Sequence, residues 1–150
     1  MAGAFPDTSF LFSIYLPRPS SANAARVFSE LDEALPVSSL LLFEFENAVR
    51  LATWIHRQDK GKGFPVQVAQ TALARLDADL DEGVLERVFC DYDQVVARAD
   101  KISTRHTWRN GHRSIDILHV ATARYLRASR FLTFDAKQRK LAEAEGMSGV

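Results

Sequence analysis

The sequence predicts an α/β fold with a mostly parallel sheet, and three observations lead to that prediction. Short apolar segments alternate with helical patterns of roughly 12–17 residues, which is the arrangement of a parallel sheet with helices on both faces. The chain has 150 residues, of which 47% are hydrophobic and 25% are charged. This length fits one domain, and this composition excludes a disordered chain. We therefore expect a single domain over residues 1–150, with three α/β/α layers and about four to five short strands.

The expected elements follow one another in a regular order. Residues 4–16 open with a strand-like stretch and continue as an apolar segment compatible with a helix. Further strands are expected at 36–40, 85–89, 131–134 and 147–150. Helices are expected at 22–34 with Ser21 as N-cap, and at 41–57, 65–81, 92–107, 114–128 and 135–146. A loop is expected at 57–64, and a turn at 108–113 around Asn110-Gly111.

Charge and cysteine content limit the classes of function. The chain has 19 basic and 19 acidic side chains, so its formal net charge is zero. This balance argues against a protein that coats nucleic acid, although it allows one local basic patch. The only cysteine, Cys90, cannot form an internal disulfide, so we expect a reducing, cytoplasmic location. The uncharged run from Thr8 to Pro17 is about half of a membrane span, and no basic segment precedes it, so neither a membrane anchor nor a secretory signal is expected.

Two aspartates directly follow predicted strands. Asp7 comes after the first strand and Asp135 after the strand at 131–134. Ligands of open α/β sheets bind beyond the carboxyl ends of the strands, so both side chains are candidates for chemistry. Asp135 is equally explained as a helix N-cap, with Gln138 three residues later. Because a proline cannot donate a ladder hydrogen bond, we also expect Pro6 to keep the first strand short or to end it at Phe5.

Helical geometry separates the two neighbouring glutamates of the helix at 41–57. At 100° per residue, Glu46 lies on the side of Arg50, four residues later, where an exposed ion pair worth a few tenths of a kcal/mol explains it. Glu44 lies on the opposite side, against Leu51 and Ile55, and has no such partner. A carboxylate in that position requires a cation, so Glu44 is the stronger candidate for a functional site.

The helix that begins near Ser114 contributes a fourth acid. Asp116 in its first turn is explained in part by the helix dipole. This helix is apolar nearly all round, so Asp116 is expected to face an enclosed space. His119 is either a ligand or, more commonly, a structural histidine. If Asp7, Glu44, Asp116 and Asp135 converge, each pair of bare charges within about 4 Å repels by roughly 4 kcal/mol at an effective dielectric near 20, so protonation or a metal is needed. Oxygen ligands without cysteine suit Mg²⁺ or Mn²⁺.

Four segments of the chain resemble the PIN-domain nucleases, and among them the VapC-type toxins of bacterial toxin–antitoxin modules. They are 5–9 (Phe-Pro-Asp-Thr-Ser), 38–48 (Ser-Ser-Leu-Leu-Leu-Phe-Glu-Phe-Glu-Asn-Ala), 113–123 (Arg-Ser-Ile-Asp-Ile-Leu-His-Val-Ala-Thr-Ala) and 131–135 (Phe-Leu-Thr-Phe-Asp). The third is the most specific, and together they cover essentially the whole chain. Pro6 departs from the pattern, which usually has an aliphatic residue there.

The resemblance implies a PIN-like fold and a Mg²⁺- or Mn²⁺-dependent endoribonuclease. The positions that match the family's catalytic, metal-binding cluster are Asp7, Glu44, Asp116 and Asp135. Ser9 and Thr133 match the hydroxyl positions that orient carboxylates beside this cluster. The resemblance also implies a homodimer, and inhibition by a small cognate antitoxin that inserts a segment into the active-site groove.

The segment 105–113 (Arg-His-Thr-Trp-Arg-Asn-Gly-His-Arg) is the predicted RNA-binding patch. Arginine forks suit phosphate, and a tryptophan can stack on an unpaired base. The candidates are Arg105, Trp108, Arg109 and Arg113. The alternative interpretation is a solvated loop, and Lys60 and Lys62 form a weaker second patch.

Two other functions compete with a nuclease. One is a catalytically silent PIN-like module that binds a protein partner, which the presence of all four acids disfavours. The other is a phosphatase of the haloacid-dehalogenase type, which would need an aspartate at the position of Ser9.

Overall fold

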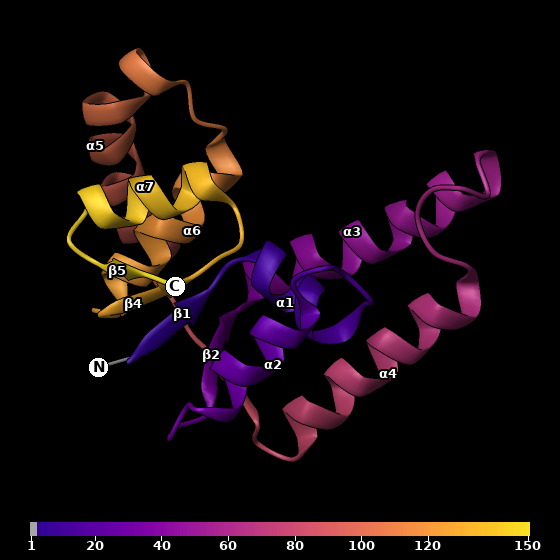
Figure 1. Cartoon of the computed structure of the whole chain (residues 1–150). Coiled ribbons are helices and arrows are strands. Elements are labelled where there is room, and N and C mark those ends of the chain that lie inside the picture. The colour runs from indigo at the N-terminus through magenta and orange to yellow at the C-terminus, as the bar shows by residue number, and fades with distance from the viewer. Residues whose placement is uncertain (1–2) are drawn as a thin grey trace.

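The structure is a computed structural model that describes residues 3–150. Its strands are β1 (Ala4–Pro6), β2 (Leu35–Ser38), β3 (Leu85–Val88), β4 (Arg130–Leu132) and β5 (Ser148–Gly149). Its helices are α1 (Thr8–Tyr15), α2 (Ser21–Ser29), α3 (Ser39–Gln58), α4 (Val66–Asp81), α5 (Tyr92–Asn110), α6 (Ser114–Tyr125) and α7 (Ala136–Ala144). The α/β class and the parallel strands are as predicted. In Figure 1, the long helices α3 and α4 lie together on one side of the strands, and α5, α6 and α7 gather on the other.

The strands form two parallel ladders instead of the single sheet that we expected. One ladder has the order β1-β4-β5, and the other pairs β2 with β3. Strands β1 and β2 contact each other, but no ladder joins them within residues 3–150. Pro6 in β1 and Pro36 in β2 carry no backbone N–H, which removes donors from this seam. Strand β1 is short, as expected, but it continues through Pro6, which pairs with Leu132.

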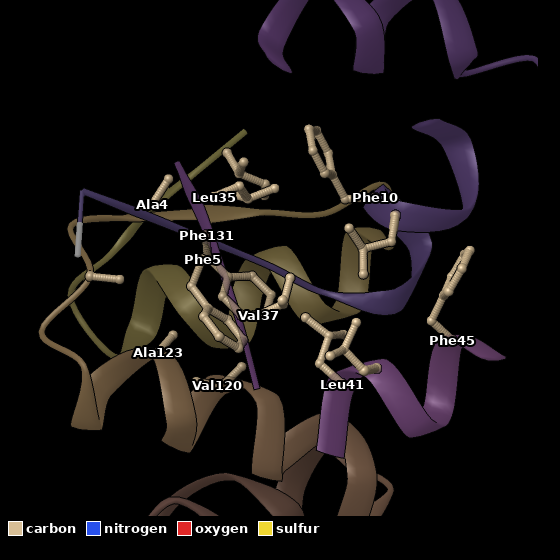
Figure 2. Packing of buried hydrophobic residues seen from close by; sticks show 14 of the residues in the cluster. Ala4, Phe5, Phe10, Leu35, Val37, Leu41, Phe45, Val120, Ala123 and Phe131 are labelled. Carbon is tan, nitrogen blue, oxygen red and sulfur yellow. The ribbon is translucent and has the colours of Figure 1, made fainter. Parts of the chain in front are cut away.

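The core lies on both faces of the strands. Consecutive residues of a strand point to opposite faces, and Ala4, Phe5 and Pro6 are all buried. In β4, Phe131 and Leu132 are likewise fully buried. Figure 2 shows Val120 and Ala123 of α6 facing the strands that carry Phe5 and Phe131. Helices therefore cover both faces of the strands, as the apolar strand segments predicted.

Helices α3 and α4 are joined by a turn that requires glycine. Gly63 has a φ of 62°, and a Cβ atom at this position would lie 2.0 Å from the carbonyl oxygen of Ala52. The next residue, Phe64, donates its N–H to the same carbonyl over 3.3 Å. A side chain at 63 would therefore displace the chain from α3 and open the connection between the two helices.

Several predicted boundaries are wrong, and each error has a local cause. Helix α2 ends at Ser29 instead of 34, and its N-cap is Ser20, because the Ser21 hydroxyl instead bonds to the backbone of Arg18 and Leu16. Strand β2 ends at Ser38, whose hydroxyl caps α3 by accepting the N–H of Leu41 over 3.1 Å.

The predicted turn at 108–113 is mostly helix. Helix α5 continues to Asn110 and stops at Gly111, whose φ of 60° and N–H bond to Thr107 form the C-cap. The residues before this glycine carry no helix breaker, so the helix extends to it. No described helix combines the length and the apolar character that crossing a membrane requires.

Candidate active site

Four carboxylates from four segments of the chain line one cavity of about 490 Å³. Asp7 follows β1, Glu44 lies on α3, Asp116 is in the first turn of α6, and Asp135 caps α7 after β4. Strands β1 and β4 run parallel and in register, so their carboxyl ends deliver Asp7 and Asp135 to the same edge. The cavity thus lies where open α/β sheets bind ligands.

Asp7 is the most enclosed of the four, with 3% of its surface exposed. Its Oδ1 accepts the Ser9 hydroxyl over 2.6 Å and the N–H of Phe10 over 3.0 Å, and its Oδ2 accepts the Thr133 hydroxyl over 2.5 Å. Asp7 is also the N-cap of α1. Burial raises the pKa of Asp7 above its ordinary value, although these hydrogen bonds act in the opposite direction. The hydroxyls of Ser9 and Thr133 therefore hold the Asp7 carboxylate in a fixed orientation. Both residues were expected beside the cluster of acids.

Glu44 is held by a buried histidine from the opposite wall. His119 on α6 has 1% of its side chain exposed, and its Nε2 is paired with Oε2 of Glu44. The Nδ1 of His119 has no hydrogen-bond partner among the described residues. Burial raises the pKa of Glu44, but the hydrogen bond and charge of His119, the nearby Thr8 hydroxyl and the charge of Arg113 outweigh it, so the pKa lies below its ordinary value. Glu44 thus faces the cavity as a carboxylate that is anchored at one oxygen.

The two outer acids are held by local contacts. Asp116 accepts the Nε–H of Arg113 over 3.0 Å, and the side chains of these residues are 19% and 79% exposed. Asp135 accepts the N–H groups of Lys137 and Gln138 over 2.8 and 3.0 Å, as expected for a helix N-cap. Asp135 is therefore the N-cap of α7, and its carboxylate also lines the cavity.

The donor set fits a hard divalent cation in its chemistry. Four carboxylates and the hydroxyls of Thr8, Ser9, Ser13 and Ser20 line the cavity with oxygen atoms, and the cysteine lies elsewhere. Within the described part of the chain, no three His, Cys, Asp or Glu side chains are gathered closely enough to form a complete metal site. His119 and Arg113 balance Glu44 and Asp116 in this arrangement, which offsets part of the repulsion that the sequence predicted.

Glu46 is not part of the cavity lining. It forms the expected exposed ion pair with Arg50 over 3.2 Å. The helical-face argument therefore separated the two glutamates correctly.

The predicted RNA-binding residues are not brought together. Arg113 lines the cavity, but Arg105 lies on α5 and binds the Glu145 carboxylate over 2.7 and 2.8 Å. Trp108 is 88% exposed near the end of α5, and Arg109 is also exposed. The patch that we expected to surround the site therefore reaches it only through Arg113, because the segment continues α5 instead of forming a loop.

Sequence reasoning missed Arg18 and left the role of His119 open. Arg18 lines the cavity from the connection between α1 and α2, with its guanidinium 5.5 Å from the centre of the Phe12 ring. Its position between Pro17 and Pro19 was the one available signal of a fixed backbone. His119 lies three residues after Asp116, but the sequence does not show that it pairs with Glu44, because Glu44 is on another helix.

Comparisons with known proteins agree with this fold. Residues 4–144 match the family model of the PIN domain. No curated protein matches the chain significantly. The structure is similar to that of VapC20 from Mycobacterium tuberculosis, a toxin that cleaves the sarcin-ricin loop, with 21% identity, 98% of each chain covered and a TM-score of 0.63. It is also similar to FitAcB from Neisseria gonorrhoeae, with 17% identity, 97% and 95% of the two chains covered and a TM-score of 0.66. A third similar structure, PAE2754 from Pyrobaculum aerophilum, has 13% identity, coverage of 99% and 90%, and a TM-score of 0.56.

Proposed function

Because the chain belongs to the PIN domain family, we propose that it is a divalent-metal-dependent endoribonuclease whose metal is held at Asp7, Glu44, Asp116 and Asp135. The observation that supports this proposal is that the four carboxylates, which are far apart in the sequence, line one cavity. Mg²⁺ or Mn²⁺ suits such oxygen ligands, and phosphodiester hydrolysis gains Lewis acidity from a cation of this kind.

The residues around the acids have distinct tasks in this proposal. Ser9 and Thr133 hold the Asp7 carboxylate at two oxygens, which leaves it little freedom to turn. His119 holds Glu44 from behind. Arg113 is largely exposed at the rim, where its guanidinium can bind a phosphate of the RNA strand as well as Asp116.

The similarity to VapC20 supports a further proposal, that the chain is the toxin of a VapBC-type module. Such a toxin acts on cellular RNA, so a cytoplasmic location, a small antitoxin partner and a homodimer are part of the same proposal. A neighbouring gene for a small DNA-binding protein would favour the toxin role over general RNA processing.

Cleavage of defined RNAs by the purified chain tests the proposed activity. We expect cleavage with Mg²⁺ or Mn²⁺ and none with EDTA. Activity that survives EDTA would contradict the metal mechanism. If the folded chain cleaves no RNA with either ion, the alternative of a silent interaction module gains support.

A further inference from the structure

A second cavity, of about 440 Å³, lies between the end of α5 and helix α7. It is separate from the cavity of the four acids and shares no lining residue with it. Its polar lining consists of basic and amide side chains, namely His106, Asn110, His112, Lys137 and Lys140. Ala136, Leu141 and Ala144 complete its walls, and no acidic side chain lines it.

The lysines of this cavity have hydrogen-bond donors to spare. The Nζ of Lys137 donates to the carbonyl oxygen of Gly111, which fixes the first turn of α7 against the end of α5. An ammonium group has three donors, so this contact leaves two for a ligand. Lys140 forms no ion pair among the described residues. Asn110 adds an amide donor from the last residue of α5.

Glu145 directly follows Ala144 of the cavity wall, and basic side chains already neutralise its charge. Glu145, at the end of α7, accepts hydrogen bonds from Arg105 and from His106, the latter over 2.8 Å. Partial burial and then the positive charges of Lys137 and His106 lower the pKa of His112, and these effects outweigh the charge of Asp116, which raises it. The local field is therefore positive, and an anion would relieve it.

Helix α7 connects the two cavities. Its N-cap, Asp135, lines the acidic cavity, while Lys137 and Lys140 in its first turns line the basic one. Arg113 lies at the rim of the acidic cavity, next in sequence to His112. An RNA backbone that extends from the four acids along α7 would therefore reach the basic cavity next.

We propose that the basic cavity binds a backbone phosphate of the RNA strand next to the bond that is cut, an inference that rests on the proposed nuclease function. It assigns RNA binding to the cavity-lining residues of 106–112 and to the two lysines of α7. Arg105 is not included, because its guanidinium is bound to Glu145.

The affinity for a short single-stranded RNA, measured in EDTA at several salt concentrations, tests this proposal. The variant is Lys137→Gln/Lys140→Gln. The matched control, Arg98→Gln/Lys101→Gln, removes the same charge from α5 at a different cavity. We expect the first variant to bind about tenfold more weakly and its salt slope to fall by roughly 0.7, which corresponds to the loss of one phosphate contact. The control should stay within about twofold of the parent protein.

Two results would overturn the inference alone. In the first, both variants bind RNA more weakly than the parent protein and to the same extent. In the second, both variants bind RNA as tightly as the parent protein. If the parent protein binds no RNA, the proposed function fails together with the inference. Free phosphate in solution is the other possible source of a phosphate group in this cavity, and inorganic phosphate is the probe for it. If it shifts the NMR signals of His112 while the lysine variant binds RNA normally, the cavity takes free phosphate and the RNA assignment is wrong. Thermal unfolding of both variants verifies that they are folded.

Discussion

Two glutamates of this chain have similar partners and different environments. Glu145 is 7% exposed and has Arg105 and His106 around its carboxylate, with both oxygens occupied. Glu44 is 28% exposed, and its Oε2 is hydrogen-bonded to His119. The first carboxylate ties the end of α7 to α5, whereas the second faces the cavity of the acids.

The difference shows what makes a buried carboxylate available for chemistry. A carboxylate with both oxygens occupied by cationic donors stabilises the fold, and a ligand would have to break those bonds first. A carboxylate anchored at one oxygen keeps its orientation and has the other oxygen free for a cation. Both Glu44 and Glu145 have a histidine and an arginine nearby, so the types of neighbouring residue do not distinguish the two carboxylates.

The largest effect is expected from Asp116→Asn. This change removes a cavity carboxylate, and we expect cleavage to fall at least about 100-fold, or about 2.7 kcal/mol of transition-state stabilisation. Stability should change little, because the ion pair with Arg113 is largely exposed. Asp7→Asn should also abolish cleavage without lowering stability, because the amide oxygen can still cap α1 and the cost of burying a charge, which raises the pKa of Asp7, is removed. Initial cleavage rates and urea unfolding measure both effects, and full activity of either variant would remove that residue from the site.

Changes at His119 test the one-sided anchoring of Glu44. His119→Leu removes the donor, and we expect Mn²⁺ affinity to fall roughly 10- to 100-fold. His119→Gln keeps an N–H near the position of Nε2 and should recover most of the affinity. The leucine variant should unfold at no lower urea concentration than the parent protein, because it also removes the unpaired buried Nδ1. Equal Mn²⁺ affinity of both variants and the parent protein would contradict a positioning role.

A change at Glu145 tests the other half of the comparison. Burial raises the pKa of Glu145, but the hydrogen bonds and charges of Arg105 and His106 outweigh it and lower the pKa below its ordinary value. The ionised carboxylate is therefore favoured by folding, and its contribution is present at neutral pH and lost as the pH falls through the folded-state pKa. We expect Glu145→Gln to cost about 1–3 kcal/mol at pH 7, to lose this cost progressively as the pH falls below the ordinary glutamate pKa of about 4.3, and to leave cleavage unchanged.

Urea unfolding of the parent protein and of Glu145→Gln at pH 7 and below pH 4 measures this dependence. A difference in stability that is constant over this range would show that the charge of Glu145 is not involved. Loss of cleavage in a stably folded variant would show that the two glutamates are not as different as their environments suggest.

The smallest effect is expected at the rim of the acidic cavity. Arg113→Ala should weaken RNA binding more than Arg50→Ala, because Arg113 lines the cavity and Arg50 is paired with Glu46 on the outer side of α3. A loss of severalfold corresponds to about 1 kcal/mol. Binding titrations in EDTA give both values, and equal effects would remove Arg113 from the binding surface.

The sequence predicted the parts of this molecule that depend on local pattern. The order of the elements, the positions of Asp7 and Asp135 after parallel strands, and the separation of Glu44 from Glu46 all follow from periodicity and helix geometry. The pairing of Glu145 with Arg105 joins residues 40 positions apart, so no local pattern reveals it. The sequence shows no partner for Arg105, so it predicts that Arg105 binds RNA. For the same reason, the sequence does not show that His112 and the lysines of α7 line one cavity.

Titration of the metal-free chain with Mn²⁺ tests the central claim most directly. We measure binding to the parent protein, Glu44→Gln and Glu145→Gln by calorimetry. We expect the parent protein and Glu145→Gln to bind alike, and Glu44→Gln to bind at least about tenfold more weakly. Equal binding by all three proteins, or a loss in Glu145→Gln alone, would contradict it.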